Sequence, residues 1–441
     1  MGCVNLPTFH SSILSISYLC SVSTKQILFN DPVYGFITVP DPFIHQIINH
    51  PYFLRLQRIR QLGLTSLVYP GALHTRFQHA MGAMHLTMMA VQTLRSKEVE
   101  ITAAEERGVL VAVLLHDIGH GPYSHALENS LVHGISHEDI SVLFLEKLNQ
   151  EFNGQLEVAI KIFDNTYKKK FLHQLVSSQL DMDRLDYLNR DSFFTGVSEG
   201  VISSERIIKM LNVVKDALVV EAKGIYSIEN FIIARRIMYW QVYLHKTVLS
   251  AEYLLVNILK RAKEIAGRAE GKKRKADGNS SDLFCTAALK EFLYNHHDKK
   301  AFVKNPELLN TFADLDDNDV FTSVKVWASH SDFTLATLCK NLVDRKLYKA
   351  VIQNDAFSKE IVNDMKKKVK AKYKLSDSEV DYFVFSQDVT NDAYRPDKIR
   401  INILSKDGKI ADITEASDQA YIGALQKTVK KYFLCYPKEL V

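Results

Sequence analysis

The sequence predicts a mainly α-helical protein with a short N-terminal β-hairpin and a small α+β region at its C-terminus. Apolar residues recur at spacings of three and four over most of residues 42–259, which is the period of an amphipathic helix. Residues 27–40 alternate around turn formers, and the period changes to that of strands after residue 380. Hydrophobic residues make up 46% of the 441 residues and charged residues 24%, as in ordinary globular proteins.

The first elements follow from these patterns in order. A hairpin is predicted over Ile27–Pro40, because Asp31, Pro32 and Gly35 provide a turn between two alternating runs. The helical region after it contains Glu105–His116, which is apolar nearly all round. Such a pattern predicts a buried helix rather than a surface helix.

The C-terminal part is expected to mix helices and strands. The predicted elements are helices over residues 283–373, strands over 381–387 and 398–413, and a last amphipathic helix over Gln419–Phe433. Residues 267–282 contain no apolar residue larger than alanine, which predicts a linker. We therefore expect a poorly specified leader (1–22), a helical core (23–266), this linker (267–282) and a C-terminal region (283–441).

Composition also limits the compartment and the class of partner. The five cysteines are scattered and form no C-x-x-C pair, which favours reduced thiols over a disulfide framework. No window approaches the ~18 consecutive apolar residues of a membrane helix. No basic residue precedes Lys25, so the N-terminus lacks the charged region of a signal peptide. We expect a cytoplasmic protein, and the net charge of +4 does not indicate nucleic-acid binding.

Histidines are concentrated in one segment. Eight of the 16 fall between His74 and His137, a span of 64 residues. They are His74, His79, His85, His116, His120, His125, His133 and His137. This density suggests that the segment uses imidazole chemically.

A set of histidines and aspartates in this region predicts a metal site. His116 and Asp117 end the buried helix together, and His79 and Asp183 lie in other predicted helices. Chain-distant ligands that meet at one helix end are typical of a catalytic metal site in a helical bundle. Nitrogen and carboxylate donors suit a cation such as Mn, Fe, Zn or Ni.

Each feature also has a plain structural interpretation. A single His-Asp pair fits a buried histidine and a helix cap about as well as it fits a ligand pair, and only the whole set favours a metal. His74, His85 and His133 are interpreted as structural. Gly119, Gly121 and Pro122 break the helix after Asp117, so His120 and His125 are expected near the same point.

A second strip of functional groups is predicted on the helix that carries Asp183. Asp183, Tyr187 and Asp191 are spaced by four residues and share one face. This strip suits a ligand with one charged end and one hydroxyl-bearing end. The alternative is a salt-bridged surface helix, in which Arg184, Asp186 and Arg190 are the partners.

These motifs resemble a known family. HTRFQH (His74–His79), HDIGHGPYSH (His116–His125) and DMDRLDY (Asp181–Tyr187) resemble the HD-domain deoxynucleoside triphosphate triphosphohydrolases. The similarity is greatest to the branch with the human sterile-alpha-motif and HD-domain enzyme and its single-domain bacterial relatives. It also covers residues 30–39, 51–63 and 231–248, although no sterile-alpha-motif domain is expected. The resemblance implies an HD-domain catalytic core over residues 23–266.

The resemblance assigns roles residue by residue. The implied metal ligands are His79, His116, Asp117 and Asp183. The implied catalytic residues are His120, His125, Glu128 and His137. The implied contacts to phosphate are Arg76, Arg184 and Arg235, and those around the sugar are Gln61, Tyr187, Asp191 and Tyr243. Tyr243 matches the tyrosine that closes the space needed by a ribose 2′-hydroxyl.

The implied reaction is hydrolysis of a deoxynucleoside triphosphate to the deoxynucleoside and inorganic triphosphate. A divalent metal (Mn, Mg, Fe, Zn or Ni) would serve as Lewis acid. His125, held by Glu128, would protonate the leaving 5′-oxygen. The resemblance further implies a homo-oligomer, a dimer or a tetramer, and a nucleotide activator.

Two departures from the human enzyme bear on specificity and regulation. Leu244 stands where that enzyme has a glutamine next to the sugar-sensing tyrosine. Asn49, Leu54 and Gln57 replace the aspartate, glutamine and arginine of its guanine-nucleotide activator site. We therefore expect no activation by a guanine nucleotide bound in that manner.

Two other functions remain open from the sequence. One is a nucleotidase or phosphodiesterase that keeps the metal site, although no GYP segment of the HD-type signalling phosphodiesterases is present. The other is a non-catalytic nucleic-acid-binding scaffold with a vestigial site. The intact ligand set and the three phosphate-facing arginines favour a triphosphate substrate over both.

Overall fold

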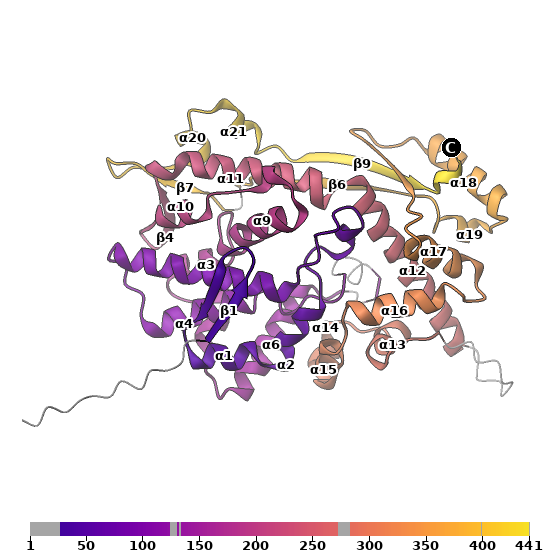
Figure 1. Ribbon diagram of the computed structural model, residues 1–441, viewed down its shortest axis with the longest axis horizontal. Coiled ribbons are helices and arrows are strands. Elements are labelled where there is room, and N and C mark those ends of the chain that lie inside the picture. Colours follow the sequence, from indigo (N-terminus) through magenta and orange to yellow (C-terminus); the bar gives the residue numbers. More distant parts are fainter. Residues whose placement is uncertain (1–26, 124–129, 132–133, 272–282, 398, 441) are drawn as a thin grey trace, which may run out of the picture.

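The computed structural model describes residues 27–123, 130–131, 134–271, 283–397 and 399–440 (Figure 1). The predicted leader and two predicted catalytic residues, His125 and Glu128, lie outside these residues. The protein is mainly α-helical, with an N-terminal hairpin and two small sheets that involve the C-terminal part, as the sequence predicts. No helix in the described ranges is both long and apolar enough to cross a membrane.

The N-terminal hairpin forms where it is predicted. Strands β1 (Ile27–Asp31) and β2 (Gly35–Val39) pair antiparallel, with Ile27 opposite Val39. The Asp31 carboxylate closes the turn, because its Oδ1 accepts backbone hydrogen bonds from Val33 (2.9 Å) and Tyr34 (3.0 Å). Gly35 has a φ of +78°, a conformation that glycine adopts without strain.

The α-helices described between the hairpin and residue 271, together with one π-helical turn, form the body of the molecule. They are α1 (Pro42–Ile48), α2 (Pro51–Leu54), α3 (Arg76–Ser96), α4 (Ala103–Leu114), α6 (His137–Glu151), α7 (Glu157–Phe163), α8 (Lys170–Val176), α9 (Met182–Thr195), α10 (Ser204–Lys209), α11 (Ile225–Met238), a π-helical turn (Tyr239–Tyr243) and α12 (Lys246–Gly271). Helix α4 is buried as predicted, since its residues from Gly108 to Leu114 are all inaccessible. A capping box of Thr102 and Glu105 begins this helix.

A β-hairpin interrupts this helical region, contrary to the helical prediction. Strands β3 (Leu211–Val214) and β4 (Ala217–Glu221) are joined by Lys215 and Asp216, both at positive φ. Valine-rich runs on both sides of a two-residue turn are the signal that predicts such a hairpin. Strand β4 also pairs with a segment that is distant in the sequence, and the local sequence gives no sign of this pairing.

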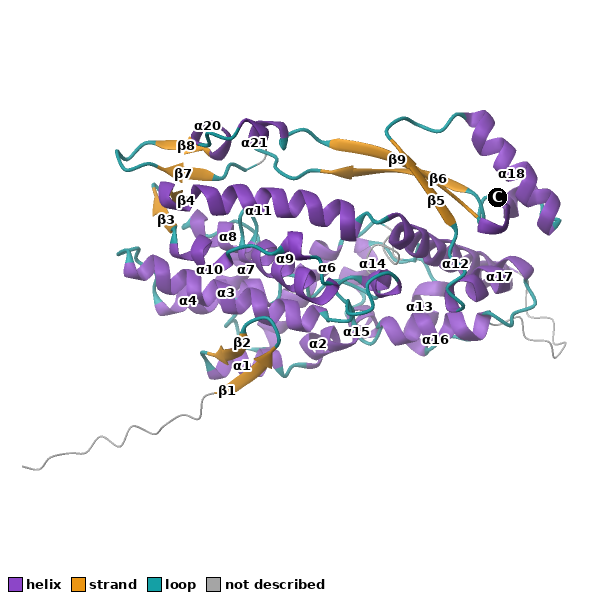
Figure 2. Ribbon diagram, turned by 45° about the horizontal axis from the view of Figure 1, so that its top comes forward, coloured by secondary structure: helices purple, strands orange, loops and turns teal. Residues whose placement is uncertain are grey.

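The C-terminal part packs on the core with helices and two sheets. Its helices are α13 (Ala287–Tyr294), α14 (Lys299–Lys304), α15 (Glu307–Ala313), α16 (Asp317–Trp327), α17 (Phe333–Val343), α18 (Lys359–Tyr373), α19 (Asp377–Val380), α20 (Ile413–Ala416) and α21 (Ala420–Ala424). Strand β7 (Asn402–Leu404) pairs parallel to β4 and antiparallel to β8 (Ile410–Asp412). In Figure 2, β7 and β8 lie beside α11, so the end of the chain completes a sheet begun in the core.

Four predicted features differ from the structure. The predicted last helix, Gln419–Phe433, is wrong beyond α21: β9 (Val429–Tyr436) lies between β5 (Lys349–Gln353) and β6 (Phe385–Asn391) in a second, antiparallel sheet. Backbone pairing on both sides of β9 overrides its local helical spacing. Strand β6 also begins four residues later than predicted.

The other two differences concern a strand and the linker. Strand β5 falls within residues 283–373, which are predicted as helical. Helix α12 continues to Gly271, so the first five residues of the predicted linker are helical, and 272–282 lie outside the described residues. One hydrophobic core runs from Ile37 to Tyr436 and thus includes both the core region and the C-terminal region.

Candidate active site

Three helices bring the predicted metal ligands together. Helix α3 begins at Arg76 with a capping box of Thr75 and Gln78, which places His79 in its first turn. His116 and Asp117 follow the end of α4, and Asp183 lies in the first turn of α9. The turn after Asp117 requires glycine, because a Cβ on Gly119 would lie 2.1 Å from the carbonyl oxygen of His137.

The donor atoms of His79, His116 and Asp183 all lie within 4.8 Å of one another. Nε2 of His79 is 3.1 Å from Oδ1 of Asp183 and 3.3 Å from Nε2 of His116. Asp117 is at the edge of this group, with Oδ1 3.3 Å from Nε2 of His116 and Oδ2 3.9 Å from Nε2 of His79. Imidazole and carboxylate donors that converge in this way fit a divalent metal.

The charges of this group also fit a bound cation. Burial by itself would lower the pKa of His79, but hydrogen bonds to Asp183 and Asp186 outweigh burial and raise it to about 10. The two histidines in turn hold the pKa of Asp183 well below its usual range, despite burial. Asp183 is therefore ionised at neutral pH, which is the form that ligates a metal.

A second layer of buried groups orients the histidine ligands. Nδ1 of His79 is 2.7 Å from Oδ2 of Asp186, and the guanidinium of Arg190 donates to both Asp186 oxygens and to Oδ2 of Asp31. Gly82 leaves room for this group, since a Cβ there would lie 2.0 Å from Oδ1 of Asp186. The sequence analysis assigned no such role to Asp186 and Arg190, which it named only as ion-pair partners in the alternative of a surface helix.

His116 is oriented by its own backbone. Its Nδ1 lies 2.6 Å from the carbonyl oxygen of Val113, so Nε2 faces Asp183. The Ser141 hydroxyl donates to the carbonyl oxygen of His116 and accepts from the Gly119 amide, which ties α6 to this turn. Such outer contacts hold a metal ligand in one tautomer.

Two of the predicted catalytic histidines lie beside the cluster. His120 Nε2 is 3.3 Å from Oδ1 of Asp117, and the ring stacks on His137 with centroids 3.8 Å apart. Burial and the nearby Arg76 lower the pKa of His120 to about 3, so it is neutral at physiological pH. His125 and Glu128 fall in the gap 124–129 that the structure does not describe.

A cleft of about 530 Å³ adjoins the cluster, and Arg76 joins the two. Arg76 lines the cleft, and its Nη1 is 2.5 Å from Oδ2 of Asp117. The cleft is lined by Gln61, Leu62, Gly63, Thr65, Arg76, Tyr123, Tyr239, Tyr243, Leu244, Leu249, Glu252, Tyr253, Val256, Lys260, Gln387 and Val389. Its volume lies in the range of small-molecule sites.

The groups predicted around a sugar lie together in this region. The Tyr243 hydroxyl donates to Oδ2 of Asp191 (2.7 Å), while Nε2 of His74 lies 2.8 Å from Oδ1. Asp191 is thus fixed from two sides, and Tyr187 packs edge-on against Tyr243. His74, interpreted from the sequence as structural, positions this carboxylate. Gln61 contributes a buried Oε1 that has no hydrogen-bond partner among the described residues.

The two other predicted phosphate contacts are arginines outside the cleft lining, of which Arg184 is partly buried and Arg235 is buried. Arg184 is hydrogen bonded to Asp181, and its Nη1 is 3.9 Å from Oδ2 of Asp183. Arg235 donates to Gln179 (3.2 Å) and to the carbonyl oxygen of Ala393 (3.1 Å). The Nε of each arginine is buried without a partner in the described part of the chain.

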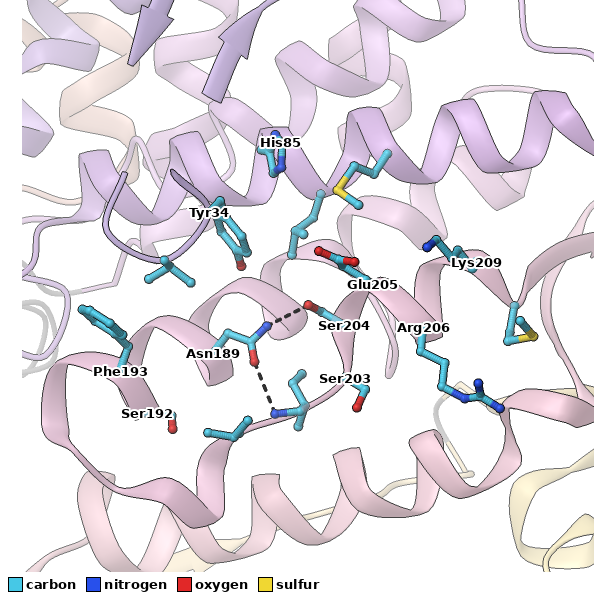
Figure 3. Close-up of a pocket in the computed structure, with 16 residues that line it drawn as sticks. Tyr34, His85, Asn189, Ser192, Phe193, Ser203, Ser204, Glu205, Arg206 and Lys209 are labelled. Atoms are coloured by element: carbon cyan, nitrogen blue, oxygen red, sulfur yellow. Dashed lines mark hydrogen bonds between the residues drawn. The ribbon is translucent and has the colours of Figure 1, made fainter. Parts of the chain in front are cut away.

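A second hollow, of about 720 Å³, lies between the hairpin turn, α3, α9 and α10 (Figure 3). Tyr34 and His85 face it from the hairpin turn and α3, with ring centroids 5.3 Å apart. Asn189 connects α9 to the segment that begins α10, because its side-chain amide donates to Ser204 and accepts from the backbone amide of Ile202. Arg190 lies over the Tyr34 ring at 5.5 Å, so this hollow borders the groups behind His79.

Comparisons with known proteins agree with this geometry. The family model described as HD domain matches residues 76–191, and that of the HD associated region matches residues 202–290. Uncharacterized protein YwfO of Bacillus subtilis is 30% identical over 433 residues, which cover 95% of this chain and 94% of that protein.

A solved structure and a curated enzyme extend the comparison. The structure of a phosphohydrolase from Bacteroides thetaiotaomicron is 48% identical, with a TM-score of 0.88, and the match covers 93% of this chain and all of that one. The deoxynucleoside triphosphate triphosphohydrolase SAMHD1 homolog of Dictyostelium discoideum is 30% identical over 254 residues, 53% of this chain and 49% of that protein. The chain belongs to the HD-domain phosphohydrolase family.

Proposed function

We propose that the protein is a metal-dependent deoxynucleoside triphosphate triphosphohydrolase. One observation carries this proposal: Arg76 lines the cleft and also holds Asp117 at the edge of the metal-donor cluster. A substrate phosphate bound by Arg76 therefore lies next to the group that would activate it. The similarity to SAMHD1 homologues supports a deoxynucleotide as this substrate.

The metal site would be formed by His79, His116, Asp117 and Asp183. When bound, a divalent metal supplies Lewis acidity toward the phosphate and compensates its charge. The residues of the chain have the remaining tasks of binding, orientation and proton transfer. Asp186 keeps Nε2 of His79 directed at the site, and Val113 does the same for His116.

Three arginines would balance a triphosphate of about four negative charges. Arg76 lines the cleft, whereas Arg184 and Arg235 do not. The Nε of Arg184 and that of Arg235 are each buried and lack a hydrogen-bond partner among the described residues. A buried cation that is incompletely hydrogen bonded is costly, and an anionic ligand would relieve that cost. Neither a monophosphate nor a cyclic dinucleotide needs three such cations at one end.

Tyr243 and Asp191 would select the deoxyribose. The Tyr243 ring lines the cleft and its hydroxyl is held by Asp191, so the ring cannot turn aside to admit a ribose 2′-hydroxyl without breaking that bond. We assign the proton for the leaving 5′-oxygen to His125 with Glu128. His120, neutral at physiological pH, would contribute a hydrogen bond to the phosphates.

The test is an assay of the purified protein with Mn²⁺ or Mg²⁺ against dNTPs, NTPs and cyclic dinucleotides. Phosphorus NMR should show tripolyphosphate as the primary product from dNTPs. Pyrophosphate or orthophosphate as the primary product, or turnover of cyclic dinucleotides alone, would favour another HD-type phosphohydrolase. No hydrolysis of any member of the panel would favour the non-catalytic scaffold.

A further inference from the structure

Glu252 places a carboxylate in the cleft that the proposed reaction does not use. It lies on α12, whose residues Leu249, Glu252, Tyr253, Val256 and Lys260 all line the cleft. Their spacing of three and four puts them on one face of the helix. Glu252 is partly buried there.

The carboxylate of Glu252 makes no hydrogen bond or ion pair with any residue that the structure describes. Burial raises its pKa to about 7, and no charged group among the described residues offsets this effect. Glu264, three turns further along α12, shows the usual arrangement, since it accepts from Tyr382 and Arg261. A desolvated carboxylate in an open cleft is poised for hydrogen-bond donors that come from a ligand.

The position of Glu252 along the cleft identifies which part of a ligand it meets. A Cβ built on Gly63 would lie 3.6 Å from Oε1 of Glu252, so the carboxylate is next to the turn that follows Gln61 and Leu62. Gln61 is assigned to the sugar and Arg76 to the phosphates. Because a carboxylate repels phosphate and attracts hydrogen-bond donors, Glu252 suits the base of a nucleotide in this cleft rather than the phosphates assigned to Arg76.

The surroundings of Glu252 suit a flat aromatic ring. Leu62, Leu244, Leu249 and Val256 provide apolar side chains to the same cleft, and Tyr253 adds an aromatic one. Gly63, with a φ of +48°, has no side chain to fill this space. A cleft with apolar walls and one carboxylate can select a ring by the hydrogen-bond donors that the ring carries.

We propose that Glu252 is a specificity-determining residue that accepts the N1–H and N2–H groups of guanine, so that dGTP is the preferred substrate. This inference rests on the proposed dNTP hydrolysis. Guanine alone among the four bases presents two adjacent donors on one edge. Thymine presents carbonyl oxygens beside its single N–H, and adenine and cytosine place a ring nitrogen acceptor beside the amino group.

The experiment compares kcat/KM for the four dNTPs at pH 8.5, where the Glu252 carboxyl group is ionised. We expect wild-type protein to prefer dGTP over dTTP by about tenfold or more, the size of a bidentate base contact. Glu252→Gln replaces one acceptor by a donor, so the preference for dGTP over dATP should collapse by at least fivefold. Glu252→Asp, which keeps a shorter carboxylate, should retain the order of preference.

Glu157→Gln is the matched control, because Glu157 is an exposed glutamate of α7 whose partner is Lys161. It should leave all four values unchanged. Equal turnover of all dNTPs by the wild type, or an equal loss for all four in Glu252→Gln, would overturn the assignment while leaving the proposed reaction intact. Failure of the wild type to hydrolyse any dNTP would overturn both.

Discussion

Nδ1 of His79 lies 2.7 Å from Oδ2 of Asp186, and both side chains are completely buried. The carboxylate fixes the histidine ring with Nε2 toward Asp183 and increases its basicity as a ligand. Asp186 is therefore as much a part of the candidate metal site as the residues that would touch the metal.

Replacing Asp186 by asparagine should weaken metal binding without removing a ligand. The amide cannot carry the negative charge that accepts the His79 N–H and pairs with Arg190, so we expect a 10- to 100-fold loss of affinity for Mn²⁺. Titration against a chelating indicator dye measures this. Asp364→Asn, on the surface of α18, is the control, and an unchanged affinity in Asp186→Asn would contradict the role given to Asp186.

Removing Asp183 should abolish both metal retention and turnover. It contacts His79 and His116 at 3.1 and 3.5 Å, so no other carboxylate of the described cluster occupies the same central position. For Asp183→Ala we expect substoichiometric metal by elemental analysis and at least a 1,000-fold loss of kcat for dNTPs, about 4 kcal/mol of transition-state stabilisation. Full metal content together with full activity would show that the ligand assignment is wrong.

Truncating Tyr243 should relax discrimination against ribose. Its hydroxyl donates to Asp191 at 2.7 Å, and Tyr187 packs against its ring. In Tyr243→Ala we expect the ratio of kcat/KM for dGTP to that for GTP to fall by about tenfold, because the space beside the sugar opens. Parallel assays of both nucleotides measure this, with Tyr226→Ala, an exposed tyrosine of α11, as control. A ratio that does not change would place the sugar elsewhere.

Because the pKa of Glu252 is raised, ionisation of this residue should destabilise the folded protein, and the effect should depend on pH. Its folded pKa of about 7 exceeds the ordinary value of 4.5, so the folded state binds this proton more tightly than the unfolded state. The wild-type free energy of unfolding should therefore fall relative to that of Glu252→Gln as pH rises from about 4.5 to 7, and the difference should then stay constant. Partial exposure limits the effect to roughly 2 kcal/mol.

Urea denaturation of both proteins at several pH values measures this difference. The other ionisable groups that line the cleft, Arg76, Lys260 and the tyrosines 123, 239, 243 and 253, are present in both proteins and cancel in the comparison. A difference between the two proteins that is independent of pH would mean that Glu252 is ionised without penalty.

Guanine nucleotide should not act as a micromolar activator. The Asn49 side chain caps α1 and donates to Nε2 and to the carbonyl oxygen of His45, at 2.8 and 2.9 Å, and Gln57 is an exposed neutral residue. Neither provides the paired carboxylate and cation of a guanine-specific site. Hydrolysis of dTTP should not change with micromolar GTP. Saturable stimulation that Asn49→Ala removes would show a guanine site at this position.

The sequence predicts the helical core well, because the core depends on local patterns, and three of the predicted ligands meet in the structure as a group that could hold a metal. The helical spacing of apolar residues predicts α3, α4 and α9. The order of the motifs then places His79, His116 and Asp183 near the ends of these helices. The strands β5 and β9 were not predicted, since each is stabilised by pairing with residues far along the chain. The β3–β4 hairpin is local and was missed within a region interpreted as helical.

The groups behind and beyond the site could not be predicted for a different reason. Asp186 and Arg190 have the same i, i+4 spacing as a surface ion pair, and only their complete burial against His79 and Asp31 separates the two cases. Glu252 lies 69 residues beyond Asp183, on a helix whose sequence gives no sign of which face meets the cleft. The assignments of His125 and Glu128 stay predictions.

The contact between Arg190 and Asp31 gives the N-terminal hairpin a part in assembly of the active site. Asp31 closes the β1–β2 turn, and its other oxygen accepts from the arginine that holds Asp186 behind His79. If the hairpin undocked, the buried guanidinium of Arg190 would lose one of its two carboxylate partners, and Asp186 could then shift. Metal retention should therefore report whether the β1–β2 hairpin is folded and docked, and a protein cleaved within that hairpin should lose its metal although every ligand is still in the chain.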